Sequence, residues 1–121
     1  MQYMLFIATD SEPDPAGEQN DTIEAWLEEG ERRGIRQMGE RLRPPEDATT
    51  IRVRKGELLV TDGPFTESKE WIAGFDIIEC ADLDEAIDYA SRHPMAHNGR
   101  IEIRPFYLWP NNELPIHELE E

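Results

Sequence analysis

Residues 71–94 read WIAGFDIIECADLDEAIDYASRHP, and this stretch decides the fold because it contains two different elements in succession. The segment 71–80 is apolar and rich in β-branched and aromatic residues, which predicts a strand. Asp82 and Glu85 then have the spacing of an N-cap and its N3 partner, so a helix is predicted to begin there and to end at Pro94. A strand followed directly by an amphipathic helix is a unit of a mixed domain in which helices cover a sheet.

Two residues of the predicted strand depart from its apolar pattern. Gly74 indicates a bulge or the close approach of a neighbouring backbone. Asp76 lies either on the solvent face or in the core with a partner and a raised pKa, and the solvent face is the expected position. The helix that follows has one predicted apolar stripe, which is formed by Leu83, Ala86, Ile87 and Ala90.

The flanking sequence supplies the other elements. They are predicted as strands at residues 3–8, 35–42 and 101–109, a helix from about Asp21 to a stop at Gly34, and a hairpin at residues 51–60 that turns at Lys55 and Gly56. Gly30 in the first helix suggests close packing, and Pro105 in the last strand suggests a sheet edge or a bulge. This order predicts an α+β, ferredoxin-like antiparallel sheet with two helices on one face. Because the other apolar face stays bare, a homodimer is expected.

The net charge of −15 is the strongest feature of the composition, with 27 acidic residues against 12 basic ones. Such an excess disfavours direct binding to nucleic acid or to an anionic membrane surface. The charges form an ordinary solvated surface or, alternatively, an acidic face that docks a basic partner. Cys80 is the one cysteine and is expected in the core, while the N-terminal apolar run is too short for a signal peptide or a membrane span. A cytoplasmic location is therefore expected.

The segment between residues 60 and 71 breaks the strand pattern at Asp62, Gly63, Pro64 and Phe65. Gly63 and Pro64 stop ladder pairing, so the break has a structural interpretation as a turn anchored by the aromatic ring. The functional interpretation notes the polar groups that follow, because a carboxylate beside a glycine at a strand end is suited to general-base catalysis or ligand contact. These neighbouring groups are Glu67, Lys69 and Glu70.

His97 is the histidine that is best suited to acid–base chemistry, since it lies in the predicted loop before the last strand. His93 and His97 have the spacing of a metal pair on a helix, but Pro94 lies between them and a third ligand is not evident. No metal or cofactor is therefore expected. His93, near the end of the predicted helix, is expected to interact with the helix dipole.

The sequence VTDGPFTESKEWIAGFDIIECADLDEAIDYASRHP, followed by GRIEIRPF, resembles the DGPF-motif proteins of the YCII-related family. The resemblance covers roughly residues 1–108. It implies a dimeric ferredoxin-like α/β barrel similar in shape to muconolactone isomerase. It also implies that the loop at residues 62–65, with Glu67, Lys69 and Glu70, borders a cleft near the dimer interface.

Better-studied relatives in this family are thought to use a His–Asp pair with the histidine early in the chain. This chain departs from that pattern, because its histidines are at 93, 97 and 117. The dyad is not carried over. Some DGPF relatives occur with extracytoplasmic-function sigma factors, so the resemblance implies a sigma factor as one possible partner.

The favoured hypothesis is a dimeric ligand-binding or regulatory module, in which the loop at Asp62 and His97 line a cleft for a small molecule or a partner segment. The alternative is a cofactor-free enzyme, such as an isomerase or lyase, that uses Asp62 or His97 as acid or base. A concave pocket holding a carboxylate with a perturbed pKa would favour the enzyme. The predicted domain covers residues 1–109, and residues 110–121 form an acidic C-terminal tail.

Overall fold

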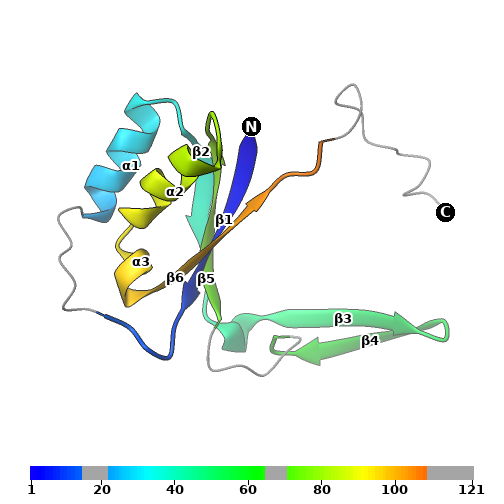
Figure 1. Ribbon diagram of the computed structural model, residues 1–121. Helices are drawn as coiled ribbons and strands as arrows, with labels where there is room; N and C mark the ends of the chain where they lie inside the picture. Colours follow the sequence, from blue (N-terminus) through cyan, green and yellow to red (C-terminus); the bar gives the residue numbers. More distant parts are fainter. Residues whose placement is uncertain (15–21, 65–70, 109–121) are drawn as a thin grey trace.

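The computed structural model describes residues 1–14, 22–64 and 71–108, and Figure 1 shows how their helices and strands are arranged. The elements in chain order are β1 (Gln2–Thr9), α1 (Ile23–Arg32), β2 (Arg36–Arg41), the 3₁₀ turn η1 (Pro45–Asp47), β3 (Thr49–Arg54), β4 (Glu57–Asp62), β5 (Ile72–Glu79), α2 (Leu83–Ser91), α3 (Met95–Asn98) and β6 (Gly99–Pro105).

Four strands form one antiparallel sheet in the order β2-β5-β1-β6, and the helices cover one of its faces (Figure 1). Apart from the separate hairpin of β3 and β4 and the short helices η1 and α3, the element order is βαββαβ, the ferredoxin-like arrangement. The predicted α+β fold with both helices on one face is therefore confirmed. The last strand ends at Pro105, earlier than predicted, and β6 is an edge strand, as its proline suggested. Trp109 lies outside the described residues.

The alternation of side chains in β1 decides which face of the sheet is buried. Tyr3, Leu5 and Ile7 are buried beneath the helices, whereas Met4 and Phe6 lie on the opposite face and stay partly exposed. Each fully buried aliphatic side chain such as Leu5 stabilises the fold by about 1.5–3 kcal/mol relative to an exposed one. No helix of the described part covers the opposite face, so its apolar side chains remain open to a further layer.

Trp26 of α1 and Tyr89 of α2 hold the two helices together. Their rings stack with centroids 4.2 Å apart, the Trp26 indole N–H donates to the Tyr89 carbonyl at 2.8 Å, and the Tyr89 hydroxyl donates to the Trp26 carbonyl at 2.9 Å. A Cβ at Gly30 would overlap the Tyr89 hydroxyl, which confirms the close packing predicted at this glycine. The helix ends as predicted, since Gly34 follows the C-cap with φ of 68°.

The N-terminus of α2 has the predicted cap, because the Asp82 carboxylate accepts the Glu85 N–H at 2.9 Å. The predicted apolar stripe is wrong in part. Leu83 and Ile87 are 49% and 48% exposed, and the buried face consists of Ala86, Tyr89 and Ala90. The hydrogen bonds between Tyr89 and Trp26 of α1 fix the rotation of α2 about its axis. The ring of Tyr89 therefore occupies the core in place of Leu83 and Ile87.

The strands β3 and β4 form the predicted hairpin, which projects away from the four-stranded sheet (Figure 1). Its turn uses Lys55 and Gly56, both with positive φ (52° and 79°), as the twist of a two-residue hairpin loop requires. Cross-strand pairing brings four exposed apolar side chains onto one face, and they are Ile51, Val53, Leu58 and Val60. An isolated two-stranded hairpin is marginally stable in water, so this apolar face favours contact with another surface.

Candidate functional site

A cleft of about 570 Å³ lies on the helix-covered side of the sheet. Its volume falls within the range of small-molecule sites, which is about 300–1,000 Å³. Apolar side chains from α1, β1 and α3 contribute to its walls, among them Trp26, Leu27, Ile7 and Met95. The polar groups that line it include Arg36, Asp76 and His93, which come from β2, β5 and the end of α2.

Arg36 and Asp76 form an ion pair between adjacent strands. The Arg36 Nε atom donates to Asp76 Oδ1 at 2.7 Å, and the two side chains are only 18% and 8% exposed. Burial raises the pKa of the Asp76 carboxyl, and the hydrogen bond and charge of Arg36 oppose this rise. The second oxygen, Oδ2, has no hydrogen-bond partner among the described residues, so it is available to a molecule in the cleft.

The expected position of Asp76 on the solvent face is therefore wrong, and the buried alternative is correct. Asp76 pairs with Leu5 on one side and with Gly39 on the other, and this register directs its side chain toward the helices. A Cβ at Gly39 would overlap the space of the Asp76 Oδ1 and Arg36 Nη2 atoms. The glycine thus creates the room in which the ion pair forms.

His93 is 6% exposed and lies just beyond the end of α2. Its Nδ1 atom accepts the Met95 N–H at 2.9 Å, and its ring lies edge-on to Trp26 with centroids 4.5 Å apart. Burial, together with the nearby charge of Arg36, lowers the pKa of His93 to about 4. The imidazole is therefore neutral at pH 7, with its proton on Nε2, and the expected role as a cationic partner of the helix dipole is wrong.

Nε2 of His93 has no hydrogen-bond partner in the described part of the chain. Because the ring lines the cleft, this N–H is a donor available to a ligand. The cleft thus combines one carboxylate acceptor, Asp76 Oδ2, with one neutral imidazole donor. The sequence did not indicate this combination, since Asp76 was expected outside the core and His93 was expected to interact with the helix dipole.

The rim of the cleft is fixed by two reciprocal hydrogen bonds between β1 and the start of β5. The Thr9 N–H donates to the Trp71 carbonyl at 2.9 Å, and the Trp71 N–H donates to the Thr9 hydroxyl oxygen at 2.8 Å. Gly74 lies nearby at a register shift between β1 and β5, and a Cβ there would closely approach the Glu40 carbonyl. The bulge and the close backbone approach predicted at this glycine are both present.

The residues of the DGPF break that the structure describes form a turn at the base of the hairpin. Asp62 is the last residue of β4, is exposed and pairs with Thr49. The Gly63 N–H donates to the Ala48 carbonyl at 2.7 Å, and its own carbonyl accepts the Thr50 hydroxyl at 2.7 Å. With φ of 101°, Gly63 occupies a conformation that other residues rarely adopt.

None of these turn residues lines the helix-side cleft. Pro64 instead borders a separate open hollow of about 890 Å³, which it shares with Trp71 and Arg43 among others. Since Trp71 lines both spaces, the turn lies near the mouth of the cleft. The other candidates of this segment, Phe65, Glu67, Lys69 and Glu70, lie outside the described residues, as does the acidic tail at 110–121.

His97 belongs to the short helix α3, so its predicted place in a loop before the last strand is wrong, and it is half-buried. Its carbonyl accepts the Asp14 N–H at 2.8 Å, but its side chain does not line the cleft that holds His93. The structure therefore does not bring Asp62 and His97 together in one cavity. Within the described ranges, no group of three or more potential metal-ligating side chains occurs.

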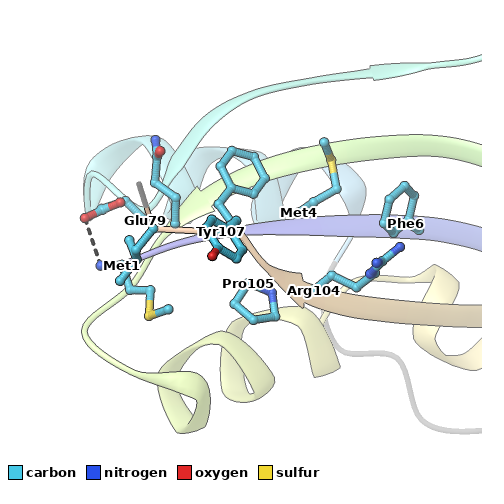
Figure 2. A pocket seen from close by; sticks show the side chains of 10 residues that line it. Met1, Met4, Phe6, Glu79, Arg104, Pro105 and Tyr107 are labelled. Atoms are coloured by element: carbon cyan, nitrogen blue, oxygen red, sulfur yellow. Dashed lines mark hydrogen bonds and ion pairs between the residues drawn. The ribbon is translucent and has the colours of Figure 1, made fainter. Parts of the chain in front are cut away.

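A second, more open hollow of about 1,180 Å³ lies at the uncovered face and edge of the sheet, and Figure 2 shows the side chains around it. Met4 and Phe6 contribute apolar surface from β1. At one end, the N-terminal amine donates to Glu79 Oε1 and to the Cys80 carbonyl, both at 3.0 Å. The apolar surface and open shape of this hollow suit contact with a protein surface better than enclosure of a small ligand.

These observations define a class of protein, an α+β domain of ferredoxin-like layout with a ligand-sized cleft between helices and sheet. A family model described as the YCII-related domain matches residues 1–110, so the chain belongs to the YCII-related family. It is also similar to an uncharacterized protein of Rhizobium meliloti (strain 1021), with 47% identity over 77 residues. This match covers 62% of the present chain and 62% of the relative. No helix in the described ranges has the length and apolar character needed to span a membrane.

Proposed function

We propose that this chain is a small-molecule-binding domain whose ligand occupies the helix-side cleft. The observation that carries the proposal is the buried Arg36–Asp76 pair, because one carboxylate oxygen and the His93 N–H both line the cleft without a partner in the described structure. Among the described residues, Glu29 Oε2 is the enclosed side-chain atom without a hydrogen-bond partner, so Asp76 Oδ2 and His93 Nε2 are not sealed from the cleft and can bond to a molecule that enters it. A ligand with one donor and one acceptor on an apolar body would satisfy both groups.

The assembly that we propose is a homodimer. Two features support it, namely the uncovered apolar face of the sheet around Met4 and Phe6, and the exposed apolar face of the projecting hairpin around Ile51 and Val60. Both are surfaces that a second copy of the chain would remove from water. A dimeric α/β barrel, the link to a sigma factor and a cytoplasmic location remain predictions from the family resemblance and the composition, as does the division at residue 109.

Native mass spectrometry of the protein purified gently from its own host tests the ligand site. We expect a reproducible small-molecule adduct on the wild-type chain, and we expect Asp76→Asn to lose it. Asp62→Asn serves as the discriminating variant, because Asp62 is exposed and does not line the helix-side cleft. Far-UV circular dichroism of each variant establishes that a lost adduct does not reflect unfolding.

An adduct that persists in Asp76→Asn but disappears in Asp62→Asn would contradict the proposed cleft and move the site to the DGPF turn. An adduct that is another protein, such as a sigma factor, would favour the regulatory alternative. A wild-type chain without any adduct, whose cleft resonances also do not respond to a library of small metabolites in two-dimensional NMR, would contradict ligand binding altogether.

A further inference from the structure

We propose that the helix-side cleft catalyses proton transfer next to the carbonyl group of a small ketone or 2-oxo acid, with Asp76 as the base and His93 as the donor to the carbonyl oxygen. This inference rests on the ligand site proposed above and adds a reaction and a substrate class to it. Two features of the cleft carry it, and they are the fixed orientation of the carboxylate and the fixed tautomer of the imidazole.

Asp76 has the placement that a base for carbon acids requires. Its Oδ1 is held by Arg36 Nε at 2.7 Å, which orients the group, while Oδ2 is left for the substrate. A carboxylate that is 8% exposed has lost most of its hydration and accepts a proton more readily than one in water. Burial accordingly raises the pKa of Asp76, although the hydrogen bond and the charge of Arg36 limit this rise.

His93 complements the carboxylate because it presents a neutral hydrogen-bond donor to the cleft. Since Nδ1 accepts the Met95 N–H, the ring presents Nε2–H to the cleft, and the low pKa of about 4 keeps the ring neutral at pH 7. A neutral imidazole is a hydrogen-bond donor that stabilises a developing enolate oxygen without holding the charge of an imidazolium. Trp26, edge-on to the ring at 4.5 Å between centroids, restricts its rotation.

All protons and electron pairs of the reaction are accounted for by the substrate, Asp76 and His93. The C–H bond next to the carbonyl breaks and the proton moves to Asp76 Oδ2. The C–H electron pair forms the C=C bond of an enolate, whose oxygen takes the carbonyl π electrons and the hydrogen bond from His93 Nε2–H. Return of the proton from Asp76 to the same carbon gives exchange, and return to another conjugated carbon gives an isomer. The step requires no oxidant or reductant.

The substrate class follows from the walls of the cleft. Trp26, Leu27, Ile7 and Met95 favour an apolar body, and the charge of Arg36 is already balanced by Asp76. The Arg41 side chain also lines the cleft and has no partner in the described part of the chain, so it is available to a substrate carboxylate. Butanone and 2-oxobutanoate are therefore matched probes, since they share an ethyl ketone and differ in the carboxylate.

The test is deuterium incorporation into each probe in D₂O, followed by NMR, with binding monitored through the resonances of the cleft residues. The wild-type chain is expected to accelerate exchange of at least one probe. Asp76→Asn is expected to lower the rate at least about 100-fold, the usual contribution of a positioned base. His93→Phe removes the donor and is expected to lower the rate about 100-fold. Glu46→Gln in η1 does not change a lining residue of the cleft, so it is the matched control and should retain the rate.

Full exchange in folded Asp76→Asn, or loss of exchange only in Asp62→Asn or His97→Gln, would overturn the assignment. Binding of a probe without exchange would overturn the reaction while leaving the ligand site intact. If neither probe perturbs the cleft resonances but the native adduct is lost on Asp76→Asn, the carbonyl substrate class is wrong and the ligand site remains. If Asp76→Asn does not fold, the His93→Phe rate decides the question.

Discussion

Lowering the pH from 7.5 to 5 should destabilise the protein through His93. The imidazole is buried against Trp26, and its pKa falls from an ordinary value of 6.5 to about 4. In the unfolded chain the ring takes up a proton below pH 6.5, whereas in the folded protein it stays neutral until the pH approaches 4. The contribution of the neutral His93 to the free energy of unfolding is therefore complete above 6.5, the pKa of the ring in the unfolded chain, and is lost as the pH falls toward 4. With about 1.36 kcal/mol for each pKa unit, the loss is about 2 kcal/mol by pH 5 and about 3 kcal/mol below pH 4.

Urea unfolding at pH 7.5 and pH 5, followed by tryptophan fluorescence, measures this loss. His93→Gln is the matched variant, because its amide oxygen can still accept the Met95 N–H but the side chain does not titrate. The carboxylates are the same in both proteins, Asp76 included, so their pH dependence cancels in the comparison. The wild-type chain should lose about 2 kcal/mol more than the variant. Equal losses in the two proteins, or an imidazole that NMR shows to titrate near pH 6.5, would refute the reasoning.

Three further predictions concern the ion pair and the assembly. Gly39→Ala should destabilise the fold by about 1–3 kcal/mol, the usual result of overpacking, because the new methyl overlaps Asp76 Oδ1, and an unchanged urea midpoint would contradict this. Arg36→Met should cost about 3–5 kcal/mol by leaving a buried carboxylate unpaired, and the double variant with Asp76→Asn should recover part of it; a single variant as stable as the wild type would contradict the pair. Val60→Glu should convert the proposed dimer to a monomer in sedimentation at micromolar concentration. A dimer retained by this variant would exclude the hairpin face from the interface, and a monomeric wild type would contradict the proposed dimer.

Local patterns were sufficient to predict most of the fold. The capped helix beginning at Asp82, the positive-φ turn at Lys55 and Gly56, and the Gly34 stop depend on neighbours in the sequence, and the structure has all three. These three predictions were correct for the same reason, because caps and turns are set by hydrogen bonds and dihedral angles within a few residues. The elements of the central sheet were predicted for the same reason, from the period of their apolar residues.

The candidate site was not predicted, because it depends on pairing between distant strands. In β5, both faces carry apolar residues, with Phe75 and Ile77 on one side and Ile78 on the other, so alternation alone does not assign a side to Asp76. The decisive neighbour is Gly39 on β2, which lacks the Cβ that would fill the space of the carboxylate. The sequence could have indicated the site only through three residues taken together. These are Arg36 and Gly39 on one strand and Asp76 on the strand that pairs with it.

His93 stands at a different place in the chain from the early histidine that the family resemblance implies. A cleft between helices and sheet receives side chains from both layers, so a donor can enter from the end of a helix as readily as from a position near the N-terminus. His93 enters in this way, and its place at the junction of α2 and α3 supplies the Met95 N–H that fixes its tautomer. Asp76 belongs to the sheet layer and is fixed there by Arg36 of the neighbouring strand. Each group is thus oriented by a contact within its own layer, and a ligand that bonds to both would connect helix and sheet.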